Sequence, residues 1–260
     1  MKRTSLLLAF VAAFTDSATF VGADKLFSAH VTGNFIVLAY DSIHGAGRNE
    51  WSKLLAFPIF VLAVMIAGRI ANKMGDAMGD RLLRIEGILL ILAGLGAVGI
   101  RLGHLGQVWL LVVVSMVIVV AMAFQNAFGR LYGKRIYGPT TVMTGNVTSA
   151  ALDIAAAVLD RPRHPEKLVP LWHNLAMILT FLLGCFIGGA CAYFFGLAAV
   201  VVPGCWCLDL CYFRGHKPVE VWPMSNLEGS FPLLIIIAPF LKTLRRIRCC
   251  CWMMKVSFCK

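Results

Sequence analysis

The feature that most constrains this chain is a series of long apolar segments separated by short polar stretches. A helix needs about 20 residues to cross the hydrocarbon core of a membrane, with roughly 17 as the lower end of the range. Hydrophobic residues make up 59% of the 260 residues, well above an ordinary globular domain. The chain is therefore predicted to be all-α, a polytopic transmembrane bundle of about six or seven helices. The apolar segments cover residues 6–22, 31–43, 54–71, 82–100, 108–128, 141–159 and 171–196.

A four-residue sequence recurs in the two halves of the chain. Val31-Thr32-Gly33-Asn34 returns 112 residues later as Met143-Thr144-Gly145-Asn146. We call Thr32-Gly33-Asn34 the first triplet and Thr144-Gly145-Asn146 the second triplet. Glycine, threonine and asparagine are poor residues for a helix interior, so each triplet is predicted to break a helix. The pattern indicates one membrane domain, residues 1–202, built from repeat halves at about 6–100 and 108–202.

The lysines and arginines between the apolar segments favour an inverted repeat. If segments 31–43 and 141–159 dip into the membrane and return, twelve of these basic residues fall on the side of the N-terminus and four on the other side. The positive-inside rule then predicts a cytoplasmic N-terminus. Segment 31–43 is too short to span easily, whereas segment 141–159 is long enough, so the length of the second copy disagrees with the charge count.

The chain carries a formal net charge of +11, but its basic residues do not gather into one face with stacking aromatics, so nucleic acid is not predicted as a partner. Phosphate-binding loops, zinc-protease motifs and hydrolase nucleophile motifs are not found. We therefore expect no enzyme activity, no catalytic residues, no cofactor and no metal. The lipid bilayer is the one partner that the composition predicts.

Asp16 lies about ten residues into the first apolar segment, where an ionised carboxylate is costly unless it faces a cavity or a partner. Its match in the second half is Asn126, so only Asp16 can titrate at this level. His30 precedes the first triplet and is a candidate proton shuttle, while Gln125 and Asn126 could line a polar path. The alternative is that all four form hydrogen bonds between helices or lie near the membrane surface.

The triplets themselves are candidate binding elements. Thr32, Gly33 and Asn34, with Thr144, Gly145 and Asn146, would leave backbone amides and carbonyls available to a solute near the midplane. The alternative is close helix packing, in which glycine permits approach and threonine or asparagine bonds across. Recurrence in both halves favours a site, and both triplets are predicted to face a common centre near Asp16.

With these residues in place, the chain resembles the YoaK-like family of bacterial membrane proteins, also called domain of unknown function 1275. The resemblance covers roughly residues 6–202 and implies an integral inner-membrane protein without a settled substrate. The sequences that carry it are Phe14-Thr15-Asp16, Phe27-x-x-His30-Val31-Thr32-Gly33-Asn34, Gln125-Asn126 and Met143-Thr144-Gly145-Asn146.

The composition changes after Val202. Seven of the nine cysteines lie between Cys205 and Cys259, and residues 203–260 are basic and depart from the family pattern. We interpret this stretch as an atypical tail, either disordered or the product of a shifted reading frame. The alternatives are a genuine tail with lipid-modified cysteines and, less favoured, metal binding, because the cysteine spacing matches no common zinc pattern.

Two functions are consistent with this sequence. The first is a secondary transporter or permease for a small solute of unspecified chemistry, multi-pass in the plasma membrane, with Asp16 and His30 providing coupling. The second is a non-transporting assembly partner or sensor whose polar residues hold helices together. The sequence predicts neither the solute nor an oligomeric state.

Overall fold

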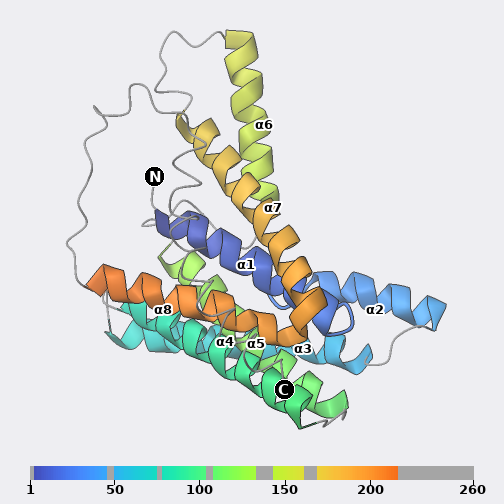
Figure 1. Ribbon diagram of the computed structural model, residues 1–260. Helices are drawn as coiled ribbons and strands as arrows, with labels where there is room; N and C mark the ends of the chain where they lie inside the picture. Colours follow the sequence, from blue (N-terminus) through green and yellow to red (C-terminus); the bar gives the residue numbers. More distant parts are fainter. Residues whose placement is uncertain are drawn as a thin grey trace. The chain divides into compact units, whose positions relative to one another are not determined.

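The computed structural model describes residues 3–45, 50–74, 78–103, 108–132, 143–160 and 169–215, and within these ranges every regular element is a helix. This confirms the all-α bundle. Figure 1 shows the elements in order. They are α1 Arg3–Gly22, α2 Gly33–His44, α3 Glu50–Met74, α4 Met78–Leu102, α5 Val108–Leu131, α6 Met143–Asp160, α7 Val169–Phe195, the 3-10 turn η4 Gly196–Val200 and α8 Val201–Gly215.

Five helical stretches in the described residues are long and apolar enough to cross a membrane, so this is a multi-pass membrane protein. They are Thr4–Gly22, Glu50–Ala71, Asp80–Leu102, Val108–Leu131 and Val169–Cys211. The last one contains α7, η4 and most of α8. Neither α2 nor α6 is among the five. With 12 residues, α2 is about 18 Å long at 1.5 Å per residue, far less than the roughly 30 Å of hydrocarbon.

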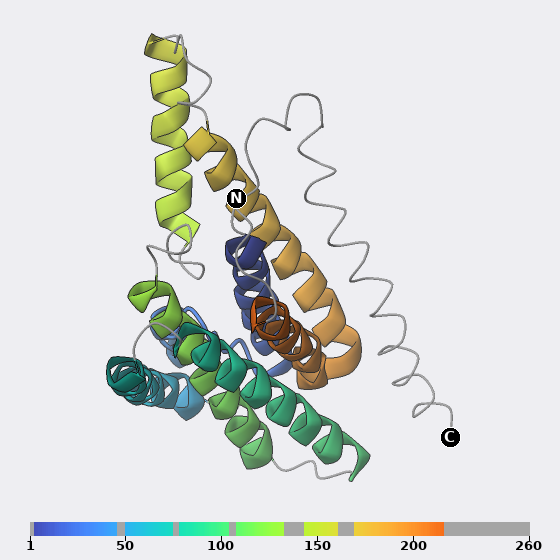
Figure 2. The same cartoon turned by 90° about the vertical axis from the view of Figure 1, so that its left-hand side faces the viewer.

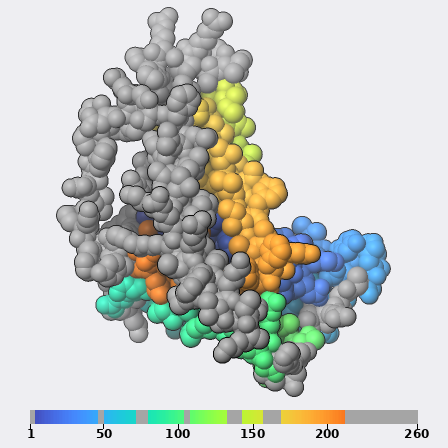
Figure 3. All heavy atoms as spheres, in the orientation of Figure 1, coloured from blue at the N-terminus to red at the C-terminus, as the bar shows by residue number. Residues whose placement is uncertain are grey.

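Helix α7 packs closely along α1, and both cartoon views show the two side by side (Figures 1 and 2). The contact is made by Gly184 and Gly188. A Cβ atom on Gly184 would lie 2.7 Å from the Phe10 carbonyl oxygen, and one on Gly188 would overlap the backbone of Phe14. Small residues four apart let helix backbones approach in this way. The outer face of α7 belongs to the surface seen in Figure 3, and its Phe186 side chain is 71% exposed.

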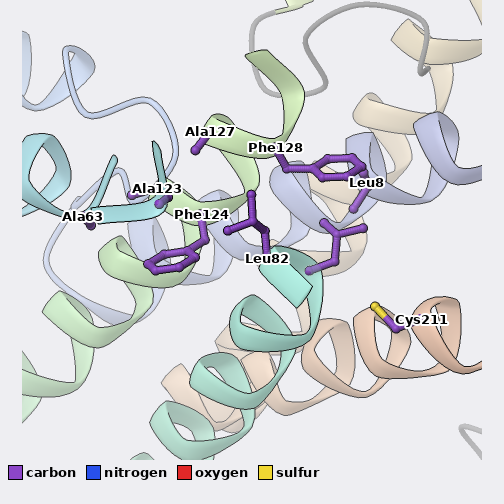
Figure 4. Packing of buried hydrophobic residues seen from close by; sticks show 10 residues of the cluster. Leu8, Ala63, Leu82, Ala123, Phe124, Ala127, Phe128 and Cys211 are labelled. Atoms are coloured by element: carbon purple, nitrogen blue, oxygen red, sulfur yellow. The ribbon is translucent and has the colours of Figure 1, made fainter. Parts of the chain in front are cut away.

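Helix α3 packs on α5 through a second set of small residues. Ala63 and Ala67 lie in one buried cluster with Ala123 and Phe124, as the close view shows for three of them (Figure 4). The same cluster includes Leu82 of α4. These side chains are nearly all inaccessible, so the α3–α5 contact forms part of the core.

Helix α4 packs against α5 and α8, and α4 meets α8 backbone to backbone. A Cβ on Gly87 would lie 3.0 Å from the Gly204 carbonyl oxygen, and a Cβ on Gly204 would lie 3.0 Å from the Gly87 oxygen. The approach is thus reciprocal. Helix α8 continues to Gly215 and crosses the boundary that the composition change indicated at residue 202. Residues 216–260, most of the predicted tail, lie outside the described residues.

The triplets lie at the beginnings of helices. Thr32 precedes α2, Gly33 is its first residue, and the second triplet lies in the first turn of α6. Helix α2 packs on α3, and α6 packs on α7. Each triplet therefore opens a helix that is not among the candidate spans, whereas the sequence predicted breaks within apolar segments.

Candidate functional site

The centre of the site is the Asp16 carboxylate, which is buried in the second half of α1. Its Oδ1 accepts hydrogen bonds of 2.7 Å from the backbone N–H groups of both Ser28 and Ala29. The Ser28 hydroxyl adds a longer bond of 3.3 Å to the same oxygen. Thr19, one turn after Asp16, lies 3.2 Å from the Ser28 hydroxyl. The carboxylate thus holds the loop that follows its own helix.

That loop returns to Asp16 because the chain reverses direction immediately after α1. Asp24 and Lys25 have positive φ angles of 54° and 62°, in the left-handed region that non-glycine residues seldom adopt. The Lys25 N–H bonds to the Phe20 carbonyl, which closes the end of the helix. Left-handed residues of this kind cost about 1 kcal/mol or more each, so the contacts made further along the loop must hold the turn in place.

His30 completes the arrangement at Asp16. Its Nδ1 lies 2.5 Å from Asp16 Oδ2, a short contact between an imidazole and a carboxylate. The His30 side chain is 32% exposed and the Asp16 side chain 6%. The imidazole also meets Phe181 of α7 edge to face, with ring centroids 5.9 Å apart. Asp16 and His30, both singled out by sequence, are therefore brought together as a pair that can share a proton.

The first triplet serves the same loop. Asn34 is buried, accepts a 2.8 Å hydrogen bond from the Phe27 N–H, and donates a 2.9 Å bond to the Phe27 carbonyl. Gly33 lies under the Phe27 ring, where a Cβ would be 3.0 Å from a ring carbon. Thr32 is exposed and makes no side-chain cap to α2. The described polar groups of this triplet thus hold the loop against the beginning of α2.

The second triplet makes different contacts. The amide of Asn146 lies 3.4 Å from the Met143 sulfur in the same turn, Thr144 is exposed, and Gly145 has open space where a Cβ would be. Helix α6 packs mainly against α7. The hydrogen bonds of the second triplet that the described residues show stay within the first turns of α6, and residues 133–142 before it lie outside the described residues.

The side chains of Gln125 and Asn126 form different kinds of hydrogen bond. Gln125 is fully buried and its amide donates a 2.7 Å hydrogen bond to the Leu8 carbonyl, which joins α5 to α1. Asn126 bonds to the Met122 carbonyl within α5. The Gln125 contact is the interhelical bridge that the alternative interpretation of these residues describes.

The family comparison accounts for most of the chain. A family model described as "Protein of unknown function (DUF1275)" matches residues 4–213. The chain belongs to the DUF1275 family. The resemblance seen in the sequence is thereby confirmed, and the match extends beyond residue 202 into α8. No curated protein and no solved structure matches the chain.

An ion-pair cluster in this DUF1275 protein was not identified from the sequence. Lys53 of α3 is completely buried and lies 2.9 Å from Asp41 of α2 and 3.5 Å from Asp24. Lys25 reaches the other oxygen of Asp41 at 3.1 Å. Lys53 lowers the pKa of the Asp41 carboxyl below its ordinary value, burial partly opposes this, and Lys25 adds to the lowering. The cluster joins the loop after α1 to both α2 and α3.

The sequence offered one clue to this cluster. Asp41 lies near the end of the segment that the first triplet opens and recurs 112 residues later as Asp153, whereas Lys53 is one of the basic residues between the apolar segments. Among the described residues of the DUF1275 chain, no group of three or more histidine, cysteine, aspartate or glutamate side chains could hold a metal ion. The chemistry that these residues can perform is proton binding and ion pairing.

Proposed function

We propose that this protein is a secondary transporter of a small solute and that the Asp16–His30 pair binds the coupling proton. The observation that carries the proposal is an acid inside a candidate span, held 2.5 Å from an imidazole that is one-third exposed. Ionisable residues within membrane helices are rare and commonly belong to proton or solute pathways. Histidine exchanges protons near neutral pH, so His30 could pass a proton between Asp16 and its surroundings.

The helix packing supports two related halves. A shift of 121 residues places Ala63 and Ala67 of α3 on Gly184 and Gly188 of α7. The first pair packs on α5 near Phe124, and the second pair packs on α1 at Phe14. Phe14 and Phe124 also correspond, because each lies two residues before a member of the matched pair Asp16 and Asn126. In each half, therefore, the third helix packs against the first helix of the other half: α3 against α5, and α7 against α1.

The remaining helix contacts also occur in matching pairs. The contact between α2 and α3 corresponds to the contact between α6 and α7. The contact between α4 and α5 corresponds to the contact between α8 and α1. In this proposal α8 takes the place of α4 in the second half, which extends that half beyond residue 202, and the two helices meet reciprocally at Gly87 and Gly204. An axis relating the halves would pass through that crossing. Two interlocked, related bundles of this kind are the usual basis of alternating access in secondary transporters.

The span pattern favours an inverted relation between the halves. If α1, α3 and α4 cross the membrane and α2 does not, the first half crosses three times and α5 starts on the opposite side. The stretch Val169–Cys211, with η4 between its two helices, is long enough for two crossings. We propose that the N-terminus is cytoplasmic and the membrane is the plasma membrane, on the basis of the basic residues. Labelling single cysteines placed in each loop of intact cells tests this arrangement.

A flux experiment tests the proposed function. The full chain is reconstituted in liposomes that contain a pH-sensitive dye, and a panel of amino acids, organic acids, sugars and nucleobases is added with and without a pH gradient. We expect at least one solute to drive proton movement, and we expect Asp16→Asn to abolish that movement. Asparagine still offers an oxygen to the Ser28 and Ala29 amides, so the loop contact survives while the titrating carboxyl is removed. Asp153→Asn, which alters an acid paired with Asn174 on α7, is the matched control.

The second candidate is a non-transporting protein in which these groups stabilise the fold. The observation in its favour is that Asp16 and Asn34 direct hydrogen bonds to backbone groups of the chain's own loop. On this interpretation the folded wild type moves none of the panel, and Asp16→Asn lowers the unfolding midpoint without any effect on flux. Proton movement retained by a folded Asp16→Asn variant would refute the role of Asp16 in coupling.

A further inference from the structure

A second acid lies in the membrane-spanning part of the molecule, far along the chain from Asp16. Glu86 belongs to α4, within the span Asp80–Leu102, and its side chain is completely buried. Its Oε1 accepts one long contact of 3.4 Å from the Cys207 thiol of α8. Its Oε2 is buried and has no hydrogen-bond partner among the described residues. This carboxyl therefore has a single weak donor.

The α4 and α8 backbones are closely packed at the residue that follows Glu86. This residue, Gly87, lies against Gly204 of α8, and each carbonyl oxygen would be 3.0 Å from a Cβ on the other glycine. Leu208 of α8 would lie at the same distance from a Gly87 Cβ. A bound metal ion would need several ligands, and the described residues offer no such group here. A proton needs no such set of ligands.

The charged groups around α4 do not neutralise Glu86. No described cation forms an ion pair with it. On the helices that pack against α4, the nearest titratable partner is the Cys207 thiol, and the neighbouring Cys211 thiol is directed to the Asp80 carbonyl. The turn η4 carries no titratable side chain. The remaining charged side chains on α4, α5, α8 and the adjoining α3 are exposed, partly buried or paired elsewhere; they are Asp80, Arg81, Arg84, Arg101, Arg130, Asp209, Glu50, Lys53 and Arg69.

We propose that Glu86 is a proton-binding site and that its neutral, protonated form stabilises the packing of α4 against α8. An ionised carboxylate without a cation or several donors is strongly unfavourable in a low-dielectric interior, whereas the neutral acid can remain there. Glu86 holds its proton while the two helices are packed. Loss of that proton to hydroxide leaves an unpaired negative charge beside the Gly87–Gly204 crossing, and separation of the helices then lets water reach the carboxylate. The site is independent of the Asp16–His30 pair and stands whether or not the protein transports a solute.

Infrared spectroscopy gives the direct test on the full chain in lipid. The difference spectrum between wild type and Glu86→Gln at neutral pH should contain the carbonyl band of a protonated carboxylic acid, shifted by deuterium exchange. Glu50→Gln, at the beginning of α3, is the control and should leave that band in place. A difference spectrum with only the two bands of an ionised carboxylate would overturn the proposal.

Thiol modification tests whether the packing of α4 against α8 depends on the protonation of Glu86. Labelling of Cys207 by a small maleimide, measured by peptide mass spectrometry, is compared between wild type and Glu86→Gln across neutral to alkaline pH. Both proteins carry the same thiol, but a negative charge on Glu86 disfavours the reactive Cys207 thiolate in wild type and so slows its labelling. A rise in the wild-type rate divided by the Glu86→Gln rate therefore reports greater exposure of the thiol. We expect this ratio to be near one at neutral pH and to rise at least several-fold as Glu86 ionises. A ratio that stays constant over the whole range would refute the proposed link between Glu86 and helix separation.

Discussion

The contact between α7 and α1 makes Gly188 intolerant of even one added methyl group. In Gly188→Ala the new Cβ would overlap the Phe14 carbonyl oxygen and lie 2.6 Å from the Phe14 Cα. Ordinary contacts begin near 3.4 Å, and the carbonyl oxygen is the nearer of the two atoms, so the two backbones must separate by about 1 Å locally. A gap of this size forfeits a quarter to a half of the dispersion energy of the affected atom pairs.

The cost follows from the nature of the obstacle. Because Phe14 presents backbone atoms, no side-chain rotation can relieve the overlap, and overpacking of this kind costs about 1–3 kcal/mol. Replacing glycine by alanine within a helix also gains about 1 kcal/mol of propensity. Gly189→Ala receives the same gain but meets nothing within 4 Å. The difference between the two variants therefore isolates the steric cost of the α1–α7 contact.

The measurement is thermal unfolding of each purified variant in detergent, followed by the fluorescence of the six tryptophans. We expect Gly188→Ala to unfold at a clearly lower temperature than Gly189→Ala, and Gly189→Ala to unfold at the same temperature as wild type or at a higher one. The free energies of unfolding of the two variants should differ by about 1–3 kcal/mol. Equal midpoints for these adjacent substitutions would refute the close approach of α7 to Phe14.

Two further predictions concern the loop and its ion pairs. Gly33→Ala should be less stable than Gly145→Ala, because a Cβ at Gly33 meets the Phe27 ring at 3.0 Å and one at Gly145 meets nothing; thermal unfolding compares them. The lowered pKa of Asp41 makes its ion pair with Lys53 stabilising above the ordinary carboxyl pKa, and this stabilisation is lost as the pH falls through the lowered value. Asp41→Asn should therefore be less stable at neutral pH and less sensitive to acid, and unchanged acid sensitivity would contradict the assignment.

The membrane class of this protein was predictable because it depends on local composition. Long apolar segments can be recognised without knowledge of their neighbours, and the structure confirms a helical bundle with five candidate spans. The short segment after residue 31 was also recognised as too short to cross, in agreement with the 12-residue helix α2. Length alone did not distinguish segment 141–159 from a membrane span, since its helix α6 has 18 residues and is still not a candidate span.

The candidate site was only partly predictable because its contacts depend on one turn. Asp16 and His30 were chosen as chemical groups, but their pairing depends on a turn in which Lys25 adopts the left-handed conformation, and a lysine does not favour that conformation. Asn34 was predicted to belong to a solute site or to a packing contact, and its side chain bonds to the loop backbone. Hydrogen-bonding partners that lie seven to fourteen residues apart in a loop cannot be read from helix periodicity.

Glu86 was missed although the rule that selected Asp16 applies to it. Both acids lie within apolar segments, and membrane-embedded acids are functional candidates by default. The two environments differ in the number of donors. Among the described residues, Asp16 receives two backbone amides, a hydroxyl and an imidazole, whereas Glu86 receives one thiol. A position inside an apolar segment marks both acids in the sequence, but the number of donors around each depends on the folded structure.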